Sequence, residues 1–441
     1  MSHKEDPTTA TGAPLSPLDP EPTPLEGAWR FALPILLALY LCFATFHALT
    51  TPTGYTGLQN APDEAAHVFI AKEFHAGRYP TEQSVRGNTI GYEWHQPPLY
   101  YFVAARFVPL GDKALRFVSV VFGLLALALI FRAGRRLFPT DPLLPAVATG
   151  FAALLPSHIA ITSAVSNDAP TEALFSWAIL LLIYSYRGGF TAQRAVYLGV
   201  AIGLALLTKA TALLLIPITL FALILLRKNG QATRQLLTNA LICFGIASLI
   251  SGGWFVRNGF LYGEFLPLHS FKQAFAGTAQ ASDFVKAEGW GGYLSLVGQW
   301  TFQSFWAVYG TPESATKGKG LPLFLPYPAL YGIFAGWVLA VLAGVARLHF
   351  KAKEMFSAVQ LMGLWTLFAT IALVAASFAG FLLTYFQTQG RYLYPAMLPI
   401  ALCSAMGWLA LFPEKSKRIA GFGFLAFMGV VTLLYLLVVT A

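Results

Sequence analysis

The chain has 441 residues, of which 56% are hydrophobic and only 11% charged. Soluble domains carry about a quarter charged residues, so this composition excludes an ordinary water-soluble protein. Apolar runs recur from residue 31 almost to the C-terminus, and in hydrocarbon such runs must be helical, because every backbone polar group needs a partner within its own segment. The sequence therefore predicts an all-α, polytopic membrane protein with about eleven transmembrane helices.

The formal net charge is +9, and basic residues gather in short gaps between the apolar runs. These gaps lie at 132–136, 227–234, 347–353 and 415–418. Short basic loops are cytoplasmic by the positive-inside rule. Membrane orientation thus accounts for the basic excess, and we expect no nucleic-acid partner.

The first 26 residues are polar and rich in Pro and Thr, which is typical of a disordered cytoplasmic tail. We expect one transmembrane domain at 27–441, beginning with a helix at about 30–48. The polar stretch at about 50–114 is too polar for the bilayer and forms a first external loop. Three further helices are expected at 115–133, at 142–162 and from Asp168 to Arg187.

The apolar run 195–226 is too long for one span of about 20 residues, and Lys209 interrupts it. A charge at the bilayer centre costs about 3 kcal/mol or more, so we expect two helices that meet near the outer face. A seventh helix at 236–255 precedes a second external region, 257–327, whose aromatic stretch suits a helix lying at the interface.

The last four expected helices flank the basic loop 349–354 and the segment 387–395, which reads QTQGRYLYP. The odd number of spans places the N-terminus inside and the C-terminus outside. Every polar segment of unusual composition then lies on the outer face.

The first external loop contains an acidic pair, Asp63 and Glu64, at the start of a short predicted helix. Asp63 and His67 are four residues apart and share one helix face. A carboxylate at the membrane boundary can accept the proton of an attacking hydroxyl or amine, as a general base does. The alternative is structural, because acids in a first helical turn are favoured by the helix dipole.

The same loop ends in YEWHQPPLYY, residues 92–101. Paired prolines fix an extended turn and then allow a helix to begin. His95 or Gln96 would be held at that turn, able to donate a hydrogen bond to a phosphate or a sugar. The alternative is a purely structural turn with interfacial aromatic side chains.

Asn167 and Asp168 resemble a helix N-terminus, so capping of the following helix is their default role. Lys209 and Arg257 lie at the outer ends of apolar segments, where a cation needs an anion. The phosphate of a lipid carrier would satisfy them, and so would a protein carboxylate such as Asp168.

Arg391 has a planar guanidinium suited to phosphate oxygens. It lies in GRYLYP, where Tyr392 and Tyr394 are either site residues or interfacial anchors. The sequence has no P-loop, Rossmann fingerprint or HExxH motif, so nucleotide-triphosphate and zinc chemistry have no support.

The order of these motifs resembles the GT-C superfamily of membrane glycosyltransferases, in the branch of the bacterial aminoarabinose transferase and the protein O-mannosyltransferases. The resemblance runs from the first expected helix to the tenth. Its motifs are Asp63-Glu64, the PPLYY turn, Asn167-Asp168, GLALLTKATALLL around Lys209, and GRYLYPAMLP. The sequence also resembles uncharacterised bacterial membrane proteins with an APDE…H opening and a QGRYLYP ending. This resemblance implies that the outer face is the periplasmic side of a bacterial inner membrane.

The resemblance implies that Asp63, with Glu64 beside it, is the catalytic base, and that Asp168 supports the acceptor or sugar site. It implies that basic residues hold the phosphate of a polyprenyl carrier, Arg391 foremost, then Arg257 and Lys209. Relatives carry a basic residue or histidine directly before PPL, a position that Gln96 occupies here, one residue after His95. No metal cofactor is expected, although a divalent ion serves oligosaccharyltransferases, for which Asp63 and His67 would be candidate ligands.

The implied function is transfer of a sugar from a polyprenyl-phosphate carrier to a lipid, glycan or protein acceptor. A transporter or flippase of lipid-linked saccharide is the chief rival, and a non-catalytic scaffold is a third possibility. Transporters place charged residues near the midplane in broken helices, whereas these charges gather on one face. The enzyme hypothesis requires the acids at 63–64 and Arg391 to share one pocket.

Overall fold

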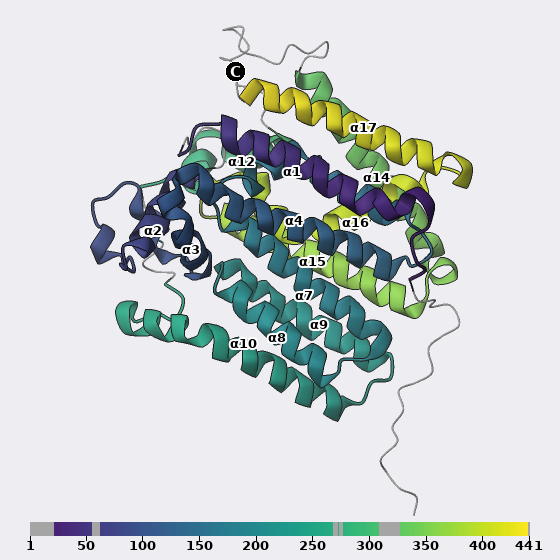
Figure 1. Cartoon of the computed structure of the whole chain (residues 1–441), viewed down its shortest axis with the longest axis horizontal. Helices are drawn as coiled ribbons and strands as arrows, with labels where there is room; N and C mark the ends of the chain where they lie inside the picture. The colour runs from purple at the N-terminus through teal and green to yellow at the C-terminus, as the bar shows by residue number, and fades with distance from the viewer. Residues whose placement is uncertain (1–21, 55–61, 268–271, 273–276, 308–326, 440–441) are drawn as a thin grey trace, which may run out of the picture.

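The computed structural model of the chain describes residues 22–54, 62–267, 272, 277–307 and 327–439. This part of the chain is built of helices, most of which lie side by side in one bundle (Figure 1). Apart from an isolated bridge between Gln280 and Tyr385, the described ranges contain no β-structure. The predicted all-α, polytopic membrane class is therefore confirmed. Of the predicted tail, only 22–26 falls within the described residues.

The bundle contains twelve α-helices, counted over the described ranges. They are α1 (Ala32–Thr50), α4 (Asp112–Leu137), α5 (Leu143–Ala153), α6 (Pro156–Thr162), α7 (Asp168–Gly188), α8 (Ala192–Leu206), α9 (Leu215–Lys228), α10 (Thr233–Tyr262), α14 (Tyr327–Met355), α15 (Ala358–Leu382), α16 (Met397–Ala410) and α17 (Glu414–Val439). Short 3₁₀ turns extend several of them: η1 (Gly27–Phe31) precedes α1, η5 (Ala210–Leu214) precedes α9, and η6 (Gly390–Ala396) precedes α16.

Eight helical segments in the described ranges are long and apolar enough to cross a membrane. The pair α5 and α6 makes a ninth if it is counted as one span bent by 65°. The bend has a local cause: Leu155 precedes Pro156 and is extended, as residues before proline prefer. Each expected span coincides with a helix or helix pair. However, α8 has only 15 residues and α7 is not among the candidate spans, so a count of eleven is not established.

The run 195–226 is divided as predicted, because α8 ends at Leu206 and η5 begins at Ala210, on either side of Lys209. The helices pack closely, with α10 on α8, α4 on α7 and α14 on α16. A side chain on Gly344 of α14 would overlap the backbone of Gly407 in α16. Such small-residue contacts are typical of helices that associate in membranes.

One end of the bundle carries the first predicted external loop. Its elements are α2 (Glu64–His75), η2 (Gln83–Val85), η3 (Gly91–His95), α3 (Leu99–Ala104) and η4 (Ala105–Leu110). The C-terminal ends of α4 and α9 and the start of α17 lie at the opposite end, as Figure 1 shows. The basic clusters adjoin those ends, so the basic loops and the α2–α3 segment are separated by the length of the bundle.

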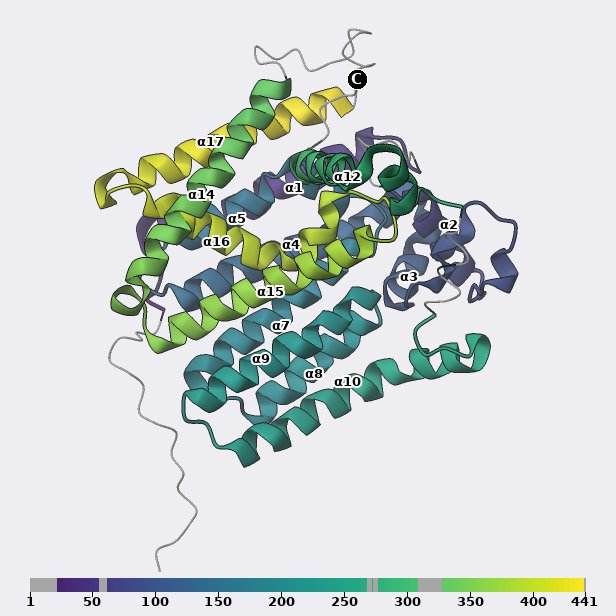
Figure 2. The ribbon, with the colours of Figure 1, turned by 180° about the vertical axis from the view of Figure 1, so that it is seen from behind.

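The second predicted external region is described only in part. Its aromatic stretch forms α12 (Ala281–Trp306), which kinks at Gly289. In Figure 2 part of α12 is seen nearly end-on while the bundle helices run across the view, so this helix lies crosswise to the bundle. Of the region 257–327, residues 268–271, 273–276 and 308–326 lie outside the described residues.

Candidate active site

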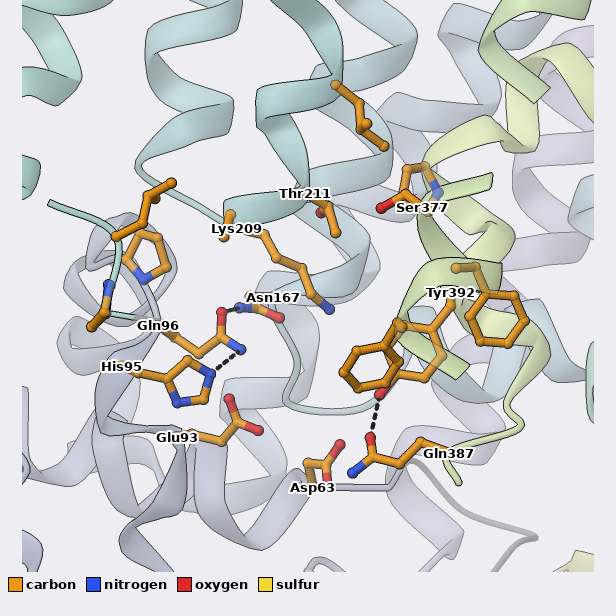
Figure 3. A pocket seen from close by; sticks show the side chains of 18 of the residues that line it. Asp63, Glu93, His95, Gln96, Asn167, Lys209, Thr211, Ser377, Gln387 and Tyr392 are labelled. Carbon is orange, nitrogen blue, oxygen red and sulfur yellow. Dashed lines mark hydrogen bonds between the residues drawn. The ribbon is translucent and has the colours of Figure 1, made fainter. Parts of the chain in front are cut away.

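A cavity of about 280 Å³ opens at the end of the bundle that carries α2 and η3. Figure 3 shows its polar side chains converging from several segments that are distant in the sequence. Eight of the side chains singled out from the sequence line it: Asp63, His67, His95, Gln96, Asn167, Lys209, Arg391 and Tyr392. The cavity therefore combines α2 and η3 with the starts of α7, η5 and η6.

Four charged side chains form a continuous chain at the cavity. Arg391 forms an ion pair with Asp63, and its Nη1 lies 3.2 Å from Oδ2 of Asp168. Asp168 is in turn paired with Lys209. Two cations and two carboxylates balance, so this cluster has no net charge.

The expected meeting of an acid at 63–64 with Arg391 is thus observed, although the two partners lie near opposite ends of the chain. Asp63 has φ of 70°, and it is the one non-glycine residue in the left-handed region among the described residues. Aspartate tolerates this conformation better than most residues, and such strain often occurs at functional sites.

The carboxylate of Asp63 is held by two side chains. Tyr92 donates its hydroxyl to Oδ1 at 2.7 Å, and Arg391 contacts Oδ2. Burial raises the pKa of Asp63, but the Arg391 guanidinium outweighs it and, with the Tyr92 hydroxyl, leaves the pKa below the ordinary value. Asp63 is therefore ionised at neutral pH.

Glu64 faces away from the cavity and is fully buried. Its two oxygens accept hydrogen bonds from Nε and Nη2 of Arg116, both at 2.7 Å. Arg116 also donates to the backbone oxygens of Ala48, Thr51 and Pro52 at the end of α1. We therefore assign Glu64 a structural role, which corrects its place in the predicted catalytic pair.

A chain of hydrogen bonds joins the PPL turn to the start of α7. His95 Nδ1 lies 2.9 Å from the backbone oxygen of Tyr92, and Gln96 Nε2 lies 3.3 Å from His95 Nε2. Asn167 donates its Nδ2 to Gln96 Oε1 at 3.0 Å and to the backbone oxygen of Thr208 at 3.2 Å. Asn167 occupies the N-cap position of α7, but its side chain makes no capping hydrogen bond there, so the predicted capping role is wrong. The side chain instead connects this turn to the loop that carries Lys209.

The sequence did not indicate that Tyr92 and Glu93 belong to the cavity wall. Both lie in the YEWHQPPLYY segment, but the pattern of a 3₁₀ turn does not reveal which side chains face inward. Burial raises the pKa of Glu93. Asn258, Ser377 and Gln387 also line the cavity, and no motif pointed to them.

Besides Glu64 and Asp168, two further sequence candidates lie outside the cavity lining. Arg257 stacks over the ring of Trp254, 4.6 Å from the centroid, and Trp254 itself lines the cavity. Tyr394 is buried and donates its hydroxyl to Ser157 at 2.8 Å. We therefore withdraw both as direct ligands.

His67 lines the cavity, and its Nδ1 is 2.7 Å from the hydroxyl of Tyr101. Burial lowers the pKa of His67 against the opposing effect of nearby carboxylates, so the ring is neutral at pH 7. Within the described residues, no three His, Cys, Asp or Glu side chains form a group that could hold a metal ion.

The rest of the cavity wall is apolar and comes from helices of the bundle. Phe378, Phe381 and Val374 of α15 face Leu214 of η5 and Phe255 of α10. A ligand that fits this cavity therefore combines a charged or polar end with an apolar portion.

The sequence matches the family model described as dolichyl-phosphate-mannose-protein mannosyltransferase over residues 95–251. No curated protein matches it. Among solved structures, ArnT from Cupriavidus metallidurans bound to undecaprenyl phosphate is 16% identical, with a TM-score of 0.50 over 90% of this chain and 64% of that chain.

The apo form of the same ArnT gives 18% identity and a TM-score of 0.51, over 92% of this chain and 65% of that chain. The oligosaccharyltransferase of Archaeoglobus fulgidus in the apo form is 15% identical, with a TM-score of 0.50 over 94% of this chain and 56% of that chain. The chain thus spans less than two thirds of the length of these proteins.

Proposed function

Because the chain has the GT-C fold, to which the family match and the solved neighbours both point, we propose that it is a membrane glycosyltransferase. It moves a hexose or pentose from a polyprenyl-phosphate carrier to a lipid, glycan or protein acceptor. The observation that carries the proposal is the ion pair of Asp63 with Arg391 in a cavity whose remaining wall is apolar. ArnT was crystallised with undecaprenyl phosphate, a carrier of this class.

The reaction we propose inverts the anomeric carbon. Asp63 takes the proton from the acceptor hydroxyl or amine as the acceptor atom forms a bond to the anomeric carbon. The bond between that carbon and the phosphate oxygen breaks, and its electron pair leaves with the polyprenyl phosphate. Lys209 and Arg391 balance the charge of the leaving phosphate, which should be the largest electrostatic contribution.

Arg391 has two tasks in this mechanism. Without donor it pairs with Asp63 and keeps that carboxylate weakly basic. A phosphate that binds Arg391 competes for the same guanidinium and weakens its hold on Asp63. The carboxylate then becomes a stronger base when the donor is present.

The site is proposed to face the non-cytoplasmic side, with the N-terminus in the cytoplasm. The support is the position of the basic loops, which adjoin the end of the bundle opposite α2 and α3 (Figure 1). The charged groups gather at one end of the bundle, which favours an enzyme supplied from one side over a transporter with a midplane site.

The test uses the full-length protein in nanodiscs with a panel of undecaprenyl-phosphate hexoses and pentoses, offered with membrane lipid and glycan acceptors. Release of free undecaprenyl phosphate is measured. Asp63→Asn should lower release by about 100-fold or more without weakening the binding of undecaprenyl phosphate, because Asp63 competes with the phosphate for Arg391. Glu73→Gln is the matched control, because Glu73 lies on the same helix and pairs with the exposed Arg78.

Release that survives Asp63→Asn would reject the proposed base. Carriage of labelled carrier across proteoliposomes without any release would instead support a flippase.

A further inference from the structure

Three buried oxygen atoms in the cavity have no hydrogen-bond partner among the described residues. They are the acceptors Oε2 of Glu93 and Oδ1 of Asn167, and the hydroxyl Oγ1 of Thr211, which can donate as well as accept. Glu93 is 6% exposed and Asn167 is 0% exposed, and both side chains line the cavity. In Figure 3 the Glu93 carboxylate lies between Asp63 and His95, and Asn167 lies beside Lys209.

The hydrogen bonds around Asn167 fix which of its side-chain atoms is free. His95 Nδ1 faces the backbone oxygen of Tyr92 and must carry the proton, so its Nε2 accepts from Gln96 Nε2. Burial lowers the pKa of His95 to about 4, which keeps the ring neutral. Gln96 Oε1 then accepts from Asn167 Nδ2, whose second hydrogen goes to Thr208. Oδ1 of Asn167 is left as an acceptor without a donor.

The same chain limits what can satisfy Glu93. Gln96 lies close enough to Glu93 to lower its pKa against the larger effect of burial, but no hydrogen bond reaches Oε2 of Glu93. A buried acceptor without a donor costs about 1–3 kcal/mol and is uncommon in folded proteins. A ligand that fills the cavity must therefore bring hydrogen-bond donors to both acceptors.

The position of these oxygens indicates which part of the ligand meets them. Asn167 directly precedes Asp168, which pairs with both Lys209 and Arg391. Those two cations are the proposed phosphate ligands, and in the proposed donor the sugar is bonded directly to the phosphate. The sugar is thus the part of the donor placed beside the unpaired acceptors.

We propose that Glu93 and Asn167 form the subsite for the donor sugar, and that this sugar presents O–H or N–H groups and carries no carboxylate. This inference rests on the proposed function and names its substrate class. The carboxylate of a uronic acid would bring acceptors to these acceptors, and its negative charge would lie near the carboxylates of Asp63 and Asp168. A neutral sugar or an amino sugar supplies the missing donors instead.

The test compares carriers with and without a sugar, using the full-length protein in nanodiscs. Dissociation constants are measured for undecaprenyl phosphate and for its glucosyl, galactosyl, mannosyl, 4-amino-pentosyl and glucuronosyl forms. At least one neutral or amino form should bind about tenfold more tightly than the bare carrier, and the glucuronosyl form should bind no more tightly.

The variant Glu93→Ala should remove most of this advantage and leave the affinity for bare carrier unchanged. Unchanged binding of the bare carrier also shows that the variant is folded. Asn167→Ala also releases the loop that carries Lys209, so its expected result is a fall in the ratio of the affinities for glycosylated and bare carrier. Glu93→Gln keeps one carbonyl acceptor and should retain part of the advantage. Arg391→Ala should weaken binding of every carrier, and Glu73→Ala should change none.

The outcomes separate the two proposals. Failure of the bare carrier to bind, or binding that ignores Arg391→Ala, would overturn the proposed function together with this inference. Binding of the bare carrier with no advantage from any neutral or amino sugar would overturn the inference alone. The inference alone would also be overturned if the advantage of the sugar persisted in both alanine variants. The same holds if bare and glycosylated carriers lost affinity equally, or if the glucuronosyl form were bound preferentially.

Discussion

Glu64→Gln provides a sharp test of the two adjacent acids, because the structure gives them different roles. Glu64 accepts four hydrogen bonds in a buried site: two from Arg116 at 2.7 Å, one from Gly54 N at 3.0 Å and one from Val165 N at 2.9 Å. Glutamine replaces one of the two oxygens by an NH₂ group, which then faces two donors. It also leaves the buried Arg116 without its counter-charge.

Glu64→Gln should lose much of the free energy of unfolding, because two hydrogen bonds are lost, one of them from Arg116, and the buried ion pair is broken. Removing one partner of such a pair costs about 3–5 kcal/mol. We therefore expect the free energy of unfolding of Glu64→Gln to fall by about that amount. Asp63→Asn should cost less, since Arg391 keeps Asp168 as a partner.

The assay is SDS titration of the protein in mixed micelles, followed by tryptophan fluorescence, with turnover measured on the fraction that stays folded. Folded Glu64→Gln should keep most of its turnover, and Asp63→Asn should lose it. The double variant Glu64→Leu/Arg116→Met should regain part of the lost stability, because it leaves no unpaired charge. Wild-type stability of Glu64→Gln combined with lost turnover would show that Glu64 takes part in the chemistry.

Three further outcomes follow from the site. Tyr92→Phe removes one of the two contacts that, against the effect of burial, keep the pKa of Asp63 low, so this pKa should rise. Turnover needs ionised Asp63 and falls as pH drops through that pKa, so the acid limb of the pH–rate profile should move to higher pH; an unmoved limb would exclude Asp63 as the titrating group. In Gly390→Ala the added methyl group would overlap the backbone of Phe305 and displace the neighbouring Arg391. The dissociation constant for undecaprenyl phosphate should therefore rise at least several-fold. Unchanged binding would contradict this packing. Finally, we propose that cationic side chains, and no divalent ion, balance the charge of the leaving phosphate. Turnover should therefore survive EDTA. A loss of turnover in EDTA that added metal restores would reject this proposal.

Much of the fold could be predicted from hydropathy alone. Apolar runs mark the bundle helices, and Lys209 marks the division between α8 and α9, because a charge in hydrocarbon is costly enough to act as a boundary. Helix α7 shows the limit of this method. It begins with Asp168 and Glu172, both buried within the protein, and a hydropathy average cannot distinguish a charge that meets lipid from one that meets another helix.

Residues of the site could be predicted only where a short sequence motif coincided with an expected position on the outer face of the membrane. Asp63 was predicted because it begins a short helix in the first external loop, and Lys209 and Arg391 because each is a charged residue at the outer end of an apolar segment. Arg257 satisfied the same criterion, yet it stacks on Trp254 outside the cavity lining, since sequence position does not fix the direction of a side chain.

The same limit applies to the acidic pair and to the PPL turn. The sequence could not separate Asp63 from Glu64, because the partner that distinguishes them, Arg116, lies in the next long helix and was counted only as part of an apolar span. Glu93 was not predicted as a site residue although it lies close to His95 in the sequence. The hydrogen bonds that orient this turn depend on Asn167, which lies about 70 residues further along the chain.

The cluster of Asp63, Asp168, Lys209 and Arg391 has a consequence for biosynthesis. A ribosome makes the chain from its N-terminus, so both acids and the lysine enter the membrane well before the arginine. Lys209, the partner of Asp168, is made about 40 residues after it. Arg391, the partner of Asp63, is made only just before the tenth expected span. A nascent chain that stops short of residue 391 would therefore hold Asp63 without its cation, and the proposed site is complete only once residue 391 has been made.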